Sequence, residues 1–114
     1  MICQDAEFMF RYHLDRYIEQ KKIPASGHRW RIVWTDDIDT PTLNVFKREL
    51  YLSQSHIWSM TEQEVRRLLR HMMAHICTWH MYKTIGHTPE FNRVCDSMRV
   101  NPDPSGCMVS EPRY

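Results

Sequence analysis

Long apolar runs are lacking in this 114-residue chain, because charged residues or histidine interrupt each apolar stretch after a few positions. The sequence therefore predicts neither a membrane-spanning helix nor a signal peptide, and we expect a nuclear or cytoplasmic protein that is not secreted and has no membrane partner. Internal repeats and low-complexity segments are also absent. A chain of this length is expected to form one domain. We place that domain over residues 1–100, with a C-terminal tail over residues 101–114.

An excess of charge of one sign is lacking too, since 15 Lys and Arg residues and 14 Asp and Glu residues give a formal net charge of +1. This balance provides no general attraction to DNA or to an anionic membrane, so a nucleic-acid contact has to come from a local patch. The candidate contacts are Arg29, Arg31, Arg66, Arg67 and Arg70. The alternative is a solvated basic surface that nearby carboxylates balance.

Paired cysteines are the third absence. The four cysteines, Cys3, Cys77, Cys95 and Cys107, include no C-x-x-C pair. We therefore expect neither a disulfide framework nor a zinc ribbon within this chain. Cys77 and Cys95 are interpreted as small core residues.

The first half of the chain predicts one helix and a small sheet. A helix is expected from Asp5, as its N-cap, to Lys21, because apolar residues recur at helical spacing and lysines lie near its end. Apolar and polar residues alternate over Trp30 to Thr35 as in a half-buried strand, and residues 43–46 and 49–53 supply further strands. We expect a small antiparallel sheet packed on helices, which gives an α+β fold class.

The second half predicts two helices. Thr61-Glu62-Gln63-Glu64 is a capping box, and the helix that it opens is expected to run to Tyr82 or Lys83. Thr88 and Pro89 then provide an N-cap and a first helical residue for another helix.

Three histidines form the most informative pattern. His71 and His75 are spaced i, i+4 on the predicted central helix, so both imidazoles can point to one place, and His87 directly precedes the N-cap of the next helix. The first two have the spacing of H-E-x-x-H metalloproteases, but Met72 stands where those enzymes carry the general base. His80 is a rival ligand that faces away on the helical wheel. The pattern favours a metal site; the alternative is a set of hydrogen-bonded or partly exposed histidines.

Two segments, Leu68 to His75 and Gly86 to Val94, resemble the SprT-like family, including its Spartan and germ-cell nuclear antigen branches. Members of that family read H-E-(M/L)-(C/A)-H and, a dozen or more residues later, G-H-G-P-E-F or a near variant. The resemblance covers roughly Arg29 to Met98. Its plainest departures are Met72 in place of Glu and Thr88 in place of the usual Gly.

The resemblance implies a zincin-like SprT domain in which His71, His75 and His87 bind zinc. It also implies a relation to proteases that cleave proteins crosslinked to DNA. Because Met72 cannot accept a proton, we expect a pseudoprotease that acts by binding, with DNA or a chromatin-bound protein as partner.

Two alternatives stay open. The first is an active, DNA-dependent zinc metalloprotease that uses another base, for which Glu64 and Glu90 are the candidates. The second is a metal-free structural or adaptor domain whose histidines bind nothing.

Overall fold

The structure, a computed structural model, describes residues 1–102 of the chain. Over this range it confirms the predicted α+β class. The elements, in chain order, are α1 (Cys3–Glu19), the 3-10 helix η1 (Ala25–Arg29), β1 (Arg31–Trp34), β2 (Thr42–Asn44), β3 (Glu49–Leu52), α2 (Gln54–Ser59), α3 (Glu62–Tyr82) and α4 (Pro89–Met98). The predicted C-terminal tail covers residues 101–114, of which residues 103–114 lie outside the described part of the chain.

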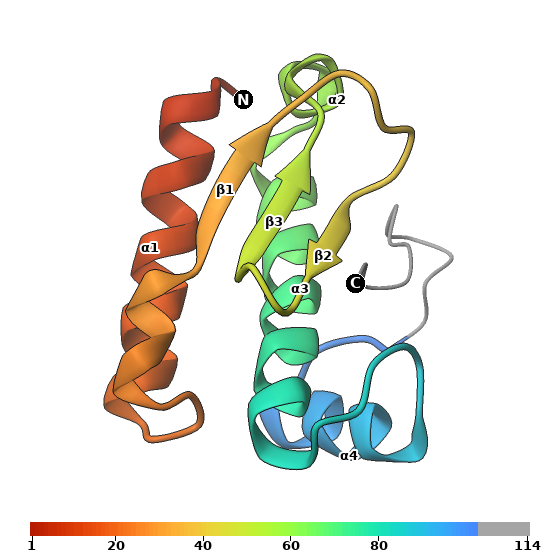
Figure 1. Cartoon of the computed structure of the whole chain (residues 1–114). Coiled ribbons are helices and arrows are strands. Elements are labelled where there is room, and N and C mark those ends of the chain that lie inside the picture. Colours follow the sequence, from red (N-terminus) through yellow and green to blue (C-terminus); the bar gives the residue numbers. More distant parts are fainter. Residues whose placement is uncertain (103–114) are drawn as a thin grey trace.

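The sheet is mixed, which corrects the expectation of an antiparallel one. Its order is β1-β3-β2, with β1 parallel to β3 and β2 antiparallel to β3. After β1 the chain crosses to the far edge and forms β2, and β3 then returns between the two (Figure 1). Leu50, in the middle of β3, is fully buried and pairs with Ile32 on one side and Leu43 on the other. The alternation of apolar residues identifies the strands and their faces, but it does not specify which strands are neighbours.

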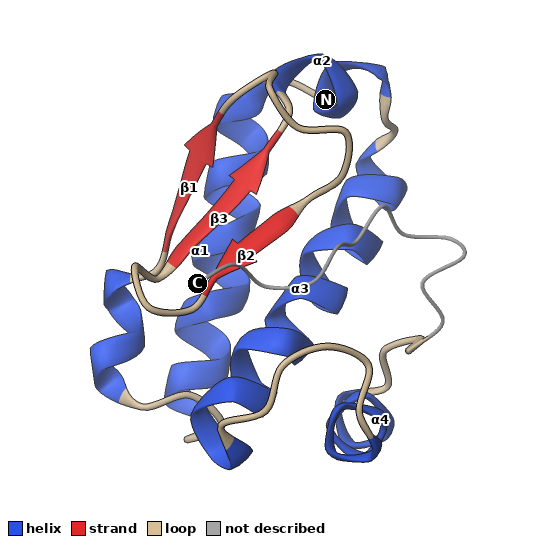
Figure 2. Cartoon of the chain, turned by 45° about the vertical axis from the view of Figure 1, so that its right-hand side comes forward, coloured by secondary structure: helices blue, strands red, loops and turns tan. Residues whose placement is uncertain are grey.

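The three strands form one layer, which covers α1 and α3, and α4 packs beside α3 (Figure 2). Phe10 of α1, Leu52 of β3 and Leu69 of α3 are among the fully buried residues that join the layers. Burying each such side chain contributes about 1.5–3 kcal/mol. This packing makes α3 the central support on which a site can be built.

The helix boundaries agree with the sequence at α3 and differ at α1 and α2. The capping box is present, since Thr61 Oγ1 accepts from the Glu64 amide and the Glu64 carboxylate accepts from the Thr61 amide. Helix α1 begins earlier than predicted, with Ile2 as N-cap and Asp5 inside the first turn. Helix α2 was not predicted; it is a short helix opened by Ser53, whose Oγ accepts from the His56 amide. None of the helices in residues 1–102 is long and apolar enough to cross a membrane.

Candidate metal centre

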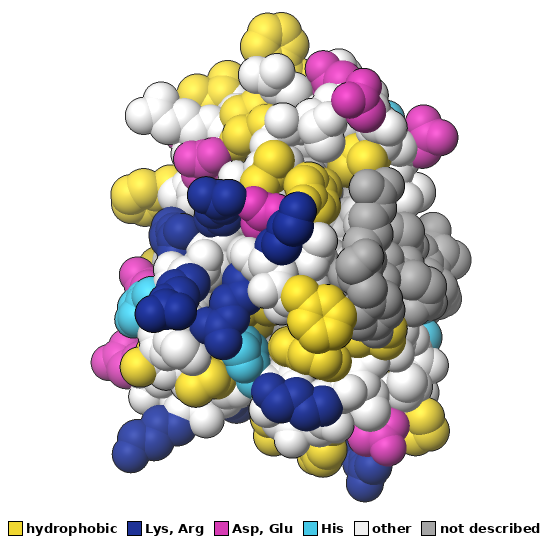
Figure 3. Space-filling view, in the orientation of Figure 1, with side chains coloured by type: hydrophobic (Ala, Val, Ile, Leu, Met, Phe, Trp, Pro, Cys, Tyr) yellow, Lys and Arg dark blue, Asp and Glu magenta, His cyan; other side chains and the backbone are white. Residues whose placement is uncertain are grey.

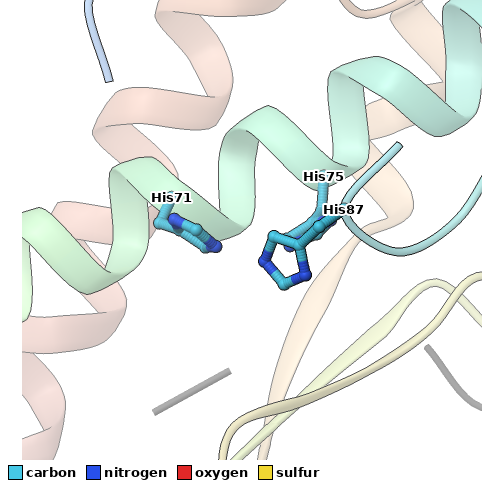
Figure 4. Close-up of side chains that lie close together, drawn as sticks. All are labelled: His71, His75 and His87. Carbon is cyan, nitrogen blue, oxygen red and sulfur yellow. The ribbon is translucent and has the colours of Figure 1, made fainter. Parts of the chain in front are cut away.

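Three histidines from two parts of the chain meet beside α3. His71 and His75 project from successive turns of α3, and His87 reaches them from the loop before α4 (Figure 4). One ring nitrogen from each lies within 4.8 Å of the other two. Imidazole nitrogens bind zinc at about 2.0–2.1 Å, so these three nitrogens are near enough to one another to be candidates for a shared ion. The structure therefore brings together all three predicted ligands.

His87 is fixed by the turn that opens α4. Gly86 adopts φ 81°, in the left-handed region that favours glycine, and so turns the chain just before His87. On the other side, Thr88 is the N-cap of α4 and its hydroxyl accepts from the Phe91 amide at 3.2 Å, while Pro89 occupies the first turn. The predicted N-cap and Pro are confirmed, and together they hold His87 over α3.

The chemistry of the two α3 histidines fits a metal. Both side chains are buried, and their Nε2 atoms have no hydrogen-bond partner within the described residues. His71 Nδ1 lies 3.1 Å from the Asn101 carbonyl oxygen, which can only accept, so Nδ1 carries the proton and Nε2 presents a lone pair. A buried polar atom without a partner is costly, and a metal ion would satisfy both Nε2 atoms.

Burial also keeps these rings neutral, which is the form that binds metal. Burial, followed by the neighbouring His71 and His87, lowers the pKa of His75 from its usual value to about 3. For His71, burial lowers the pKa, the Asn101 carbonyl acts in the opposite direction, and His87 lowers it further. Metal ions compete with protons for the same lone pairs, so neutral rings at physiological pH favour binding.

Phe91 is a residue of this site to which the sequence assigned no role. Its ring is fully buried and contacts all three imidazoles: it stacks on His75 with centroids 4.1 Å apart, and it meets His71 and His87 edge to face at 5.2 and 5.1 Å. Phe91 lies one turn into α4, inside the G-H-T-P-E-F segment. It forms an apolar wall that excludes water from one side of the cluster.

No carboxylate joins the three histidines within residues 1–102. Met72, the residue after His71, is fully buried in the core. Glu64 is engaged in the capping box, and hydrogen bonds from the Thr61 backbone amide and then from the Thr61 side chain lower the pKa of its carboxyl group. Glu90 lies 3.8 Å from the Arg93 guanidinium, on α4. Neither candidate substitute base belongs to the cluster.

The other histidines lie elsewhere. His80 Nε2 accepts a hydrogen bond from the Trp30 indole at 2.9 Å, so this rival ligand turns away from the cluster as the helical wheel predicted. His28 lies 3.3 Å from Asp15, and His56 is part of α2.

The five predicted nucleic-acid contacts do not form one surface. Arg66, Arg67 and Arg70 line two adjoining hollows along α3. We call the two hollows together the arginine groove. Its cationic lining residues are Arg16, Lys22, Arg66, Arg67, Arg70 and Arg99. The sequence did not indicate that Arg16, Lys22 and Arg99 belong to this surface. No Asp or Glu of the described chain lines it.

Arg29 and Arg31 lie apart from the arginine groove. Arg31 pairs with Glu49 and lines a separate hollow beside α1 and β1. Figure 3 shows Lys and Arg side chains gathered over η1 and the adjacent end of the sheet, with exposed apolar side chains beside them. The predicted contacts therefore divide into two separate basic areas.

Comparison with known protein families matches residues 6–110 to the SprT-like family. Comparisons with curated proteins and with solved structures gave no significant match. The family match spans nearly the whole chain, including α3, the His87 turn and α4. The chain therefore belongs to the SprT-like family, which is of the zinc metalloprotease type.

Proposed function

We propose that this domain binds zinc through His71, His75 and His87 and acts as a pseudoprotease, by binding and not by cleavage. One observation carries the proposal: within residues 1–102, three converging imidazoles leave two buried Nε2 atoms without a hydrogen-bond partner, and no carboxylate belongs to the cluster. The histidines supply the ligands that a metal requires. At the position from which a general base would transfer protons, the chain has Met72, which cannot do so.

The chemistry of peptide hydrolysis explains why Met72 matters. Zinc bound by three imidazoles with an open position can polarise a carbonyl and lower the pKa of bound water to about 7. Hydrolysis also needs a group that takes a proton from the attacking water and gives one to the leaving amine. Such groups typically accelerate the reaction by a factor of about 10²–10⁴. A thioether has no exchangeable proton and is too weak a base for either role.

A cleavage assay tests this proposal. The full chain with one equivalent of zinc is incubated with a DNA-bound protein substrate, with and without single-stranded DNA, beside the His71→Ala variant. We expect no cleavage above that of the variant in either condition. Zinc-dependent cleavage by the unmodified chain that His71→Ala abolishes would overturn the pseudoprotease assignment and support the active-protease alternative.

The same proposal includes nucleic acid as a partner, and the arginine groove supports it. Among residues 1–102, six cations and no acidic side chain line the groove, in a protein whose formal net charge is only +1. Arg66 is partly neutralised by Glu62 at 3.1 Å, but Arg67 and Arg99 are exposed. Guanidinium groups bind phosphate oxygens well, and phosphate contacts supply most non-specific affinity for nucleic acid.

Salt-dependent binding of a fluorescent single-stranded oligonucleotide tests this part. Arg67→Ala combined with Arg99→Ala should weaken binding and reduce the slope of log affinity against log salt by about 1.5, because two phosphate contacts are lost. The matched control is Arg29→Ala with Lys47→Ala, which removes the same charge from exposed positions outside the groove. An equal or larger effect of the control pair, or no binding by the unmodified chain, would contradict the assignment.

A further inference from the structure

The chain leaves α4 through a sharp turn that brings it back to α3. Arg99 caps α4 in the left-handed conformation, with φ 57°, and the Val100 amide donates to the Cys95 carbonyl at 2.8 Å. This pairing is typical of a Schellman ending, in which main-chain donors satisfy some of the last carbonyls of a helix. The carbonyls of Met98 and Arg99 are left for other donors.

Two consecutive residues of α3 hold the returning segment. The Arg70 guanidinium donates to the Met98 carbonyl at 2.9 Å and lies 3.4 Å from that of Arg99. The next residue, His71, donates from Nδ1 to the Asn101 carbonyl at 3.1 Å. The segment from 98 to 101 therefore lies between a charged anchor and a metal-site imidazole.

The two anchors differ in strength. A hydrogen bond from a charged donor contributes about 1.5–3 kcal/mol, compared with about 0.5–1.5 kcal/mol for a neutral one. A guanidinium at the C-terminal end of a helix is further favoured by the helix dipole. Arg70 is thus the stronger of the two anchors.

We propose that Arg70 is a positioning residue for the metal centre. By holding the end of α4, it places the Asn101 carbonyl on His71 Nδ1 and so keeps the imidazole proton on that nitrogen. The lone pair of Nε2 is then directed to the cluster with His75 and His87. This role rests on the proposed zinc site, but its first consequence, the tautomer of His71, exists without metal.

The direction in which zinc affinity changes when the Arg70 guanidinium is removed distinguishes a positioning role from a purely electrostatic one. Removing the Arg70 guanidinium takes a positive charge away from the neighbourhood of a cation site, which by Coulomb attraction and repulsion alone would tighten zinc binding. Positioning predicts the opposite: without its acceptor, Nδ1 can lose the proton to Nε2, and the ring must then rearrange before it binds metal.

The experiment uses the full chain in three variants. Arg70→Met keeps the aliphatic stem and removes the donors; Arg70→Lys keeps a charged donor that cannot span two carbonyls; Arg67→Met removes the same charge from an exposed neighbour that also lines the arginine groove. Nitrogen-15 NMR of the metal-free protein reports the His71 tautomer, and competition with a chelator reports zinc affinity. Thermal unfolding confirms that each variant is folded.

We expect the Nδ1–H tautomer of His71 in the unmodified chain and in Arg67→Met. In Arg70→Met the Nε2–H tautomer should become populated and zinc affinity should fall by about 10- to 100-fold. Arg70→Lys should lie between the two, which keeps the test available if Arg70→Met does not fold. Two results would overturn the proposal: a His71 tautomer that is unchanged in the folded Arg70 variants, or a zinc affinity of the Arg70 variants that rises as much as that of Arg67→Met. If the unmodified chain binds no zinc, the proposed function fails, and the tautomer still decides the role of Arg70.

Discussion

Met72→Glu is the substitution that restores the missing glutamate, and the structure predicts a large cost for it. Met72 is fully buried among core residues. Replacing it loses about 1.5–3 kcal/mol of apolar burial, and a carboxyl group buried without a partner adds about 1–3 kcal/mol. We expect the metal-free variant to be less stable by roughly 2.5–6 kcal/mol, a fall in melting temperature of roughly 10–25 °C.

Zinc should offset part of that cost in a way that depends on charge. Burial raises the pKa of a carboxyl group, whereas a nearby cation favours its ionised form. Zinc at the three histidines should therefore stabilise Met72→Glu more than it stabilises Met72→Gln, which has a similar shape but no charge. Each tenfold difference in zinc affinity between the two variants corresponds to about 1.4 kcal/mol of extra stabilisation.

Differential scanning calorimetry of the two variants, with and without zinc, measures both effects. The Gln variant serves as the control for the loss of apolar packing. If Met72→Glu is as stable as the unmodified chain without metal, position 72 is not the dry core position that the structure shows. If zinc shifts the two melting temperatures equally, the metal does not lie close enough to residue 72 for the site to be a zincin-like one.

Two further predictions concern Phe91 and His80. Phe91→Leu should weaken zinc binding because it removes the ring that stacks on His75, whereas Phe10→Leu, at a core position of α1, should lower the melting temperature similarly and leave the affinity unchanged; equal affinities in a chelator competition would contradict this role. Burial, followed by Arg48 and Lys83, lowers the pKa of His80 to about 4. Between pH 6.5 and 4 the unfolded chain therefore takes up a proton that the folded chain does not, and the free energy of unfolding should decrease as the pH falls. Because His80 is only partly buried, we expect it to account for about 1 kcal/mol of the pH-dependent change in the free energy of unfolding. Urea unfolding of the unmodified chain and of His80→Gln across this pH range measures this contribution, and identical pH profiles would refute it.

The convergence of the three histidines was predictable because it depends on local rules. Spacing of i, i+4 places His71 and His75 on one face of any helix, and the Thr88-Pro89 start of α4 fixes where His87 can lie. The capping box fixed the start of α3 in the same way. Each of these features is specified within a few residues of sequence.

The features that sequence did not reveal depend on long-range or main-chain contacts. The insertion of β3 between β1 and β2 is a choice of neighbours, about which alternation carries no information. Contact of His71 with residue 101 uses a backbone carbonyl, which every residue possesses. The arginine groove combines Arg16 of α1 with Arg99 after α4, two residues separated by most of the chain.

X-ray absorption at the zinc edge tests the central claim most directly, because it reports both the presence of the metal and the atoms bound to it. On the purified full chain, we predict about one zinc per molecule, with three imidazole nitrogens and one further light atom at about 2.0–2.1 Å. The His75→Ala variant should lose most of this signal. An absence of zinc, or sulfur scattering at about 2.3 Å that shows cysteine ligands, would contradict the assignment of His71, His75 and His87 as the metal site.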